Sequence, residues 1–181
     1  PVHAIKTVRS DLLLLEFPKP VRGVLGLQWR PPDAGWIKIN TDGATDMGLI
    51  RGGAGFIARD HHGALVRAGG SRYDGVTDSL SIELLACRDA ILMAQDMGFQ
   101  QVVLETDCQE IQQLWDAPQR STCFHLIMEM KEMSTLFQGF RLRFSGRQTN
   151  MAAHRVARHS LNLSVFMHVY DTIPGWLTDC L

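Results

Sequence analysis

Hydrophobic and polar residues alternate from Trp36 to Asp42, which is the clearest pattern in the first part of the chain. Alternation with a period of two predicts a strand, because successive side chains of a strand point to opposite faces. A glycine-rich stretch leads to a second apolar segment, Phe56–Arg59, and the turn sequence Asp60–Gly63 leads to a third, Ala64–Ala68. Apolar segments joined by short glycine-containing turns indicate hairpins, so we expect three antiparallel strands.

The spacing of apolar residues changes after residue 79. Apolar residues recur at helical intervals from Leu80 to Met97, and Gly98 is a typical residue for a helix C-terminus, so this stretch predicts a helix. The continuous apolar run Val102–Leu104 predicts a buried parallel strand. The same two periods then predict a short helix around Ile111, Leu114 and Trp115, a helix from Leu126 to Phe137, a strand from Phe140 to Phe144 and a closing helix from Asn150 to Leu161.

The order of these elements, βββαβααβα, predicts an α/β fold. We expect a mixed five-stranded sheet, with three antiparallel strands plus two parallel strands, flanked by helices. A chain of 181 residues with 45% hydrophobic content can bury one sizeable core. Residues 29–161 form the predicted domain, residues 162–181 a C-terminal tail, and residues 1–28 an N-terminal extension that is helical from about Ala4 to Glu16.

Composition limits the possible functions. The 18 basic and 19 acidic residues exclude a strongly cationic protein, so any affinity for nucleic acid must come from a local patch. The four cysteines are widely spaced, which argues against a zinc site and favours reduced thiols. The apolar run Leu12–Leu15 is too short to span a bilayer, and no leader pattern precedes it. We expect an intracellular protein, nuclear or cytoplasmic, that does not act at a membrane.

Three acidic residues have similar settings on separate predicted elements. Asp42 and Asp107 each end a strand, and Glu83 lies near the start of the first long helix. Sites in α/β sheets gather outside the carboxyl ends of strands, so the three side chains could converge. Carboxylates suit Mg²⁺, and two ions ~4 Å apart can activate an attacking water and stabilise a leaving oxygen. Any one of these acids alone is better explained as a turn former or helix cap, but the three together predict a metal site.

The acids lie within longer motifs. These are Trp36–Ala44, Gly52–Asp60, Glu83–Ala86, Glu105–Cys108 and Asn150–Ala157, with the lead-in Trp29–Pro32 before them and Pro174–Leu177 after them. As a set, the motifs resemble the ribonuclease H superfamily, specifically the reverse transcriptase-like ribonuclease H domains abundant in plants. The resemblance covers roughly residues 29 to 160 and implies the ribonuclease H-like fold.

The resemblance also implies a set of site residues. Asp42, Glu83 and Asp107 would hold Mg²⁺ or Mn²⁺, and the substrate would be an RNA–DNA hybrid or another nucleic acid. In the family, groups beside the acids recognise the RNA 2′-hydroxyls, which distinguish RNA from DNA. The positions that match these groups here are Gly43, Ala44, Cys108 and Gln109. Two further candidates for substrate binding are Asn150 of the last motif and Arg147, which could meet phosphate.

The chain departs from the family pattern in three places. His154 stands where the family usually has a fourth acid, and imidazole suits Mn²⁺ better than Mg²⁺. The loop Phe144–Thr149 lacks the histidine that many active members carry there, and Asp116–Cys123 contains no basic protrusion. His154 either completes the catalytic site or is a structural residue of a packed helix, and the sequence favours neither.

Two functions are therefore predicted. The first is a ribonuclease H-type endonuclease that hydrolyses the RNA strand of hybrids by two-metal-ion catalysis, with Asp42, Glu83, Asp107 and His154 as its catalytic residues. The second is a catalytically weak or inactive module, in a plant or retroelement-derived protein, that binds nucleic acid or a protein partner. The complete acidic trio favours the first, and the three departures favour the second.

Overall fold

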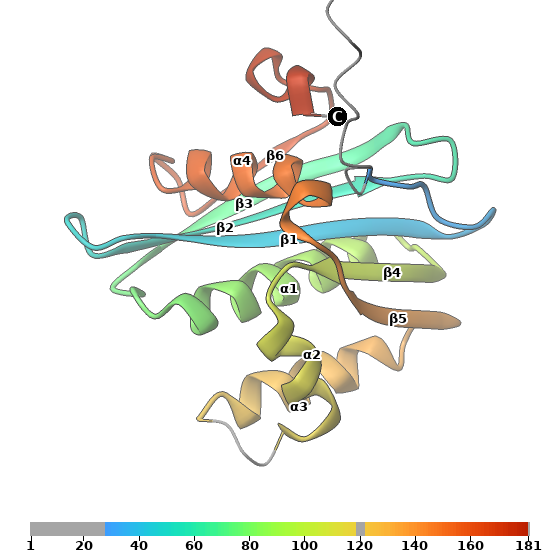
Figure 1. Cartoon of the computed structure of the whole chain (residues 1–181), viewed down its shortest axis with the longest axis horizontal. Coiled ribbons are helices and arrows are strands. Elements are labelled where there is room, and N and C mark those ends of the chain that lie inside the picture. The colour runs from blue at the N-terminus through green and yellow to red at the C-terminus, as the bar shows by residue number, and fades with distance from the viewer. Residues whose placement is uncertain (1–27, 119–121, 181) are drawn as a thin grey trace, which may run out of the picture.

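A six-stranded mixed sheet runs through the middle of the structure, a computed structural model that describes residues 28–118 and 122–180 (Figure 1). The predicted helix of residues 4–16 lies outside these described residues. The strand order across the sheet is β5-β4-β1-β2-β3-β6. The strands are β1 Ile37–Asp46, β2 Arg51–Arg59, β3 Leu65–Asp74, β4 Gln101–Thr106, β5 Gly139–Phe144 and β6 Met167–Tyr170.

The strand pairing follows the predicted order. β1, β2 and β3 pair antiparallel as successive hairpins, and β4 and β5 extend the sheet from β1 in parallel. The mixed α/β fold is therefore confirmed, but the sheet has one strand more than the five expected. β6 pairs antiparallel with β3 and comes from the segment assigned to the C-terminal tail. With four residues it is too short to carry a hydrophobic pattern, and backbone pairing rather than periodicity defines it.

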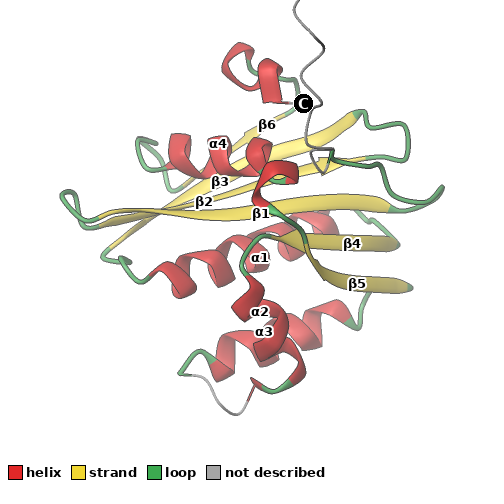
Figure 2. Cartoon of the chain, viewed as in Figure 1, coloured by secondary structure: helices red, strands yellow, loops and turns green. Residues whose placement is uncertain are grey.

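Helices cover both faces of the sheet, as the red ribbons of Figure 2 show. The helices are α1 Ser79–Asp96, α2 Gln109–Asp116, α3 Phe124–Ser134 and α4 Met151–Ser160, with short 3₁₀ turns η2 Arg147–Thr149 and η3 Gly175–Cys180. In Figure 1, α1, α2 and α3 lie below the sheet and α4 lies above it. None of the described helices is both long and apolar enough to cross a membrane.

Each face of the sheet carries its own core. Ile39, Phe56 and Leu104 pack against α1 and α3 in the larger core, and Ile57 packs against Val156 of α4 in the smaller one. Figure 1 shows α4 lying close over the strands, and glycine makes this approach possible. A Cβ atom at Gly55 would lie 2.3 Å from the backbone nitrogen of Ala157. The strand must therefore present backbone alone to α4, the helix that carries His154.

Candidate active site

The three predicted acids meet at one end of the central strands. Asp42 lies in β1, Asp107 directly follows β4, and Glu83 lies in the second turn of α1. One carboxylate oxygen from each residue lies within 4.8 Å of those from the other two. This separation allows the three side chains to share one cation, since Mg²⁺ and Mn²⁺ accept carboxylate oxygen as ligand.

Strand register brings the two aspartates together. β1 and β4 are parallel neighbours, and Thr41 pairs with Thr106. Asp42 and Asp107 each follow one of these paired threonines, so they lie side by side where β4 ends. The expectation that Asp42 ends its strand is wrong, because β1 continues to Asp46 through its pairing with β2. The same parallel pairing continues to β5, which places the loop after that strand beside Asp107 as well: the Ser145 backbone N–H donates to the carbonyl oxygen of Thr106.

Glu83 reaches the aspartates because α1 approaches β1 closely at Gly43. A Cβ atom at Gly43 would lie 2.8 Å from the Glu83 backbone nitrogen, so any larger residue would push the helix away. The Gly43 N–H also donates to Glu83 Oε2 at 3.0 Å, which fixes the orientation of the carboxylate. Gly43 thus contributes to the site by placing Glu83.

Burial and crowding make the three carboxylates costly to ionise together. Asp42 is 2% exposed, and burial, followed by the charges of Glu83 and Asp107, raises its pKa to about 9. Burial and the charge of Asp107 raise the pKa of Glu83 to about 8, although the Gly43 N–H and Arg147 act in the opposite direction. A divalent cation among the carboxylates would compensate their charge, so the residues present fit a hard metal ion.

His154 lies next to Asp42, at the edge of this cluster. Its Nδ1 is 2.9 Å from Asp42 Oδ2, and its Nε2 is 3.4 Å from Nη2 of Arg147 in η2. Burial and the positive charges of Arg147 and Arg158 lower the pKa of His154. The structure therefore joins the residue at the usual fourth acidic position to the acidic trio through a hydrogen bond.

The remaining predicted site residues surround the acids at different depths. Gln109 is exposed at the start of α2, and Cys108 before it is half-buried. Ala44 is buried against Ala157 and Leu161 of the α4 side. Asn150 has no exposed surface, and its Nδ2 donates to the Thr41 carbonyl oxygen at 2.8 Å. This contact fixes the start of α4 on β1, and burial of the whole side chain keeps Asn150 away from any substrate in this structure.

A second polar cluster, which the sequence analysis did not single out, lies on the same face of β1. Lys38 Nζ is 2.7 Å from Glu105 Oε1, and Asn40 donates to Glu105 Oε2 at 3.1 Å. Arg59 and Trp29 both donate to Asn40 Oδ1. The available signal was the alternation in β1, which puts Lys38 and Asn40 on the face of Asp42.

A family profile described as reverse transcriptase-like matches residues 40–160, a stretch that contains the whole acidic trio and His154. The chain belongs to this family. The predicted membership of the ribonuclease H superfamily is thereby confirmed. No protein of curated function matches the sequence.

Solved structures of ribonucleases H share the fold of this family member. Ribonuclease H1 of Halobacterium salinarum has a TM-score of 0.65 and 22% identity, over 70% of this chain and 98% of that one. The N-terminal ribonuclease H domain of a Mycobacterium tuberculosis protein has a TM-score of 0.63 and 13% identity, over 70% and 94%. LC11-RNase H1, isolated from compost and solved with an RNA/DNA hybrid, has a TM-score of 0.62 and 16% identity, over 70% and 96%. At these identities the likeness establishes the fold.

Proposed function

We propose that this protein is a ribonuclease H-type nuclease that hydrolyses the RNA strand of RNA–DNA hybrids with Mg²⁺ or Mn²⁺. The observation that carries the proposal is the convergence of Asp42, Glu83 and Asp107, with carboxylate oxygens within 4.8 Å of one another. Membership of the reverse transcriptase-like family and the fold shared with a ribonuclease H solved on a hybrid support the choice of substrate.

The three acids would hold the metal on a rigid support. Asp42 is buried in a central strand, and Glu83 is oriented by the Gly43 N–H, so neither carboxylate must reorganise to bind a cation. When bound, the metal supplies positive charge that activates an attacking water and stabilises the leaving oxygen of a phosphodiester. The part of the protein is to fix the geometry in which this charge acts.

Substrate recognition would fall to the exposed groups beside the acids. Gln109 is exposed at the start of α2, two residues after Asp107 in the chain. Its side-chain amide can hydrogen-bond a ribose 2′-hydroxyl. Arg147 is exposed beside His154, and its guanidinium suits a phosphate. The net charge of −1 makes these local contacts, rather than the field of the whole protein, responsible for affinity.

Cleavage of a labelled RNA–DNA hybrid in Mg²⁺ and in Mn²⁺ tests the proposal. We expect the RNA strand to be cut, Asp42→Asn to abolish cutting, and a duplex of two DNA strands to stay intact. Asp96→Asn is the matched control, because Asp96 is exposed at the far end of α1 from Glu83. Activity that survives in Asp42→Asn would refute the proposal. Binding of the hybrid without cleavage would favour the alternative, a module that binds nucleic acid or a protein partner.

A further inference from the structure

Both ring nitrogens of His154 are engaged, and their partners define the tautomer. A guanidinium has only N–H donors, so Nε2 of His154 must accept the hydrogen bond from Arg147. The proton of the neutral imidazole then sits on Nδ1, which donates to Asp42 Oδ2 at 2.9 Å. In this arrangement the ring keeps no lone pair with which to bind a metal. Direct ligation by His154 would require one of the two hydrogen bonds to break.

The same contacts occupy the position at which a second metal ion would need a ligand. An ion beside Asp42 on this side would meet an imidazole N–H and a guanidinium instead of a fourth carboxylate, and both repel a cation. Arg147 carries a permanent positive charge, and a single imidazole ring separates its guanidinium from the Asp42 carboxylate. The protein itself therefore supplies positive charge on the His154 side of Asp42.

We propose that the Arg147–His154 pair takes the place of the second metal ion, so that the acidic trio binds a single divalent cation and Arg147 binds the substrate phosphate. This inference rests on the proposed function and departs from the two-metal-ion catalysis that the sequence predicts. Arginine suits the role because its planar fork matches phosphate oxygens and always carries its charge. His154 is a positioning residue, since its two ring nitrogens hydrogen-bond the Arg147 guanidinium and the Asp42 carboxylate and it does not itself contact the substrate.

Counting bound Mn²⁺ by electron paramagnetic resonance tests the number of ions directly. The count is made on the free protein and on its complex with a hybrid whose 3′-bridging oxygens are replaced by methylene, which prevents cleavage. We expect one ion per chain in both samples and two in the complex of His154→Asp, which restores a fourth carboxylate. We also expect the bound Mn²⁺ to show no nitrogen coupling from a histidine ligand.

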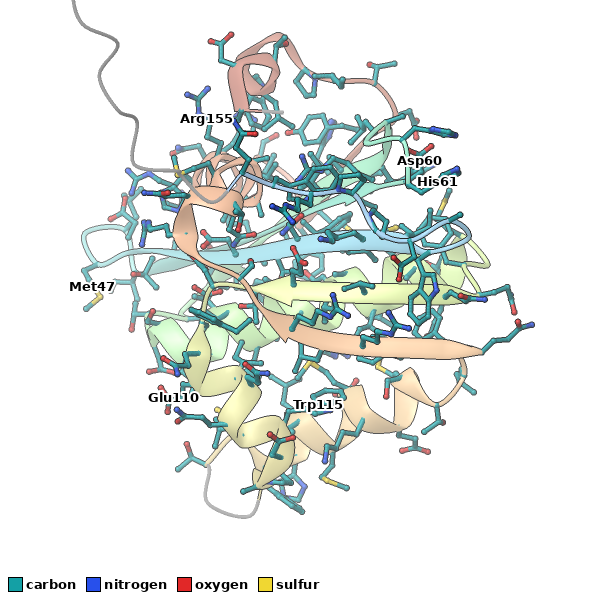
Figure 3. The ribbon with its side chains drawn as sticks, turned by 45° about the vertical axis from the view of Figure 1, so that its right-hand side comes forward. Met47, Asp60, His61, Glu110, Trp115 and Arg155 are labelled. Carbon is teal, nitrogen blue, oxygen red and sulfur yellow. The ribbon has the colours of Figure 1, made fainter. Side chains whose placement is uncertain are left out.

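His61→Asp is the matched control for the added carboxylate. His61 is exposed in the turn between β2 and β3, at the opposite end of the sheet from Met47 in the β1–β2 turn (Figure 3). This variant should keep a count of one. Two ions in the unaltered complex, or a nitrogen coupling that disappears in His154→Ala, would overturn this inference alone. A complete absence of Mn²⁺ binding would overturn the proposed function as well.

Kinetics separate the role of Arg147 from a merely structural one. Arg147→Ala should lower the single-turnover rate about 100-fold, as expected when one group that stabilises transition-state charge is removed. Arg147→Lys should recover part of that loss, because it keeps the charge without the planar fork. The double variant His154→Asp, Arg147→Ala should recover activity with Mn²⁺, because a second ion can then bind. A double variant as slow as Arg147→Ala would contradict the proposal that the Arg147–His154 pair takes the place of the second metal ion.

Discussion

Two polar clusters lie on the same face of β1, two residues apart, and they differ in how their charge is balanced. In the first, Lys38 and Arg59 surround Asn40 and Glu105, and each has a protein partner. In the second, Asp42 meets two further acids. The first cluster pairs its carboxylate with a lysine inside the folded chain, whereas the second brings three acids together in an arrangement that could hold a cation. Three crowded carboxylates beside a network of oppositely charged partners therefore mark the part of the sheet that is proposed to serve function.

The two clusters should also have opposite effects on stability. Burying a charge is unfavourable unless it is paired, and breaking a buried pair leaves its partner uncompensated. The first cluster joins β1 to β4 through Lys38 and Glu105, so it supports the strand register that places Asp42 beside Asp107. The second lowers the stability of the metal-free protein, as functional sites often do.

The largest effect that we expect is on catalysis. Glu83→Gln should lower the rate of hybrid cleavage about 1,000-fold, because a neutral amide is a poor ligand for the cation and the Glu83 side chain is fixed in place. The same change should raise the melting temperature of the metal-free protein at pH 8, because one buried like charge is removed. Rates measured with saturating Mn²⁺ and melting curves recorded in chelator check both parts. A fall in activity accompanied by a lower melting temperature would indicate misfolding instead.

The next largest effect concerns the first cluster, which is called the paired cluster below and consists of Lys38, Asn40, Arg59 and Glu105. Glu105→Ala should destabilise the protein by about 3 kcal/mol, because Lys38, which is 7% exposed, would be left buried without its carboxylate. Urea unfolding measures this loss. Glu129→Ala is the control, since its pair with Arg88 at 2.8 Å is partly exposed and should contribute less than about 1 kcal/mol. Equal losses in the two variants would mean that burial of the Lys38 pair is unimportant.

The acidic cluster predicts how the stability of the metal-free protein depends on pH. Asp42 and Glu83 have ordinary pKa values of 3.8 and 4.5, and the fold raises them to about 9 and about 8. Raised carboxyl pKa values give stability that is complete below pH 4 and is lost progressively as the pH rises from there through the folded pKa values of about 8 and about 9. We expect the free energy of unfolding in chelator to fall between pH 5 and pH 9 by at most about 1.4 kcal/mol per pH unit for each of the two carboxyl groups, as measured by denaturant unfolding.

Two additions sharpen this pH prediction. Asp42→Asn should flatten the pH dependence, because the group with the larger shift no longer titrates. Saturating Mn²⁺ should restore stability most at high pH, since the carboxylates must lose their protons to bind it. A stability that rises with pH in chelator would show that these acids are ionised in the folded protein and that their charges are already balanced.

The sequence predicted the elements well because most of them carry a clear hydrophobic period. The alternation before Asp42 and the helical spacing from Leu80 to Met97 correspond to β1 and α1. Asp107 was found from its setting at a strand end, whereas Asp42, which lies inside β1, was found from the family motifs. β6 was not predicted, because this strand is defined by backbone pairing with β3 and not by a pattern in its own residues.

The connections between elements could not be predicted from the sequence. The chain Arg147–His154–Asp42 depends on how η2 and α4 sit over β1, and the position of His154 in the motif reveals only its nearness to the acids. Asn150 matched a family motif, yet its complete burial depends on the glycines that let α4 approach the sheet. Such contacts follow from tertiary packing, which periodicity does not encode.

The smallest effect that we expect comes from the cover of the paired cluster. Trp29 donates its indole N–H to Asn40 Oδ1 at 2.8 Å, and the Arg59 guanidinium lies 3.5 Å from the centre of its ring. Trp29→Phe removes the hydrogen bond and keeps an aromatic ring. Because Asn40 Oδ1 still accepts from Arg59, the loss should be only about 1 kcal/mol in urea unfolding.

Trp36→Phe separates this hydrogen bond from the ring–cation contact. Trp36 also has a guanidinium over its ring, that of Arg141 at 4.0 Å, but its indole N–H donates to no acceptor within the part of the chain that the structure describes. We expect the loss in Trp36→Phe to be smaller than in Trp29→Phe. Equal losses would mean that the aromatic faces, and not the bond to Asn40, hold the lead-in segment on the sheet. A larger loss of stability in Trp29→Phe would show that the lead-in segment stabilises the domain through its hydrogen bond to Asn40. Asn40 lies in β1, the strand that also carries Asp42.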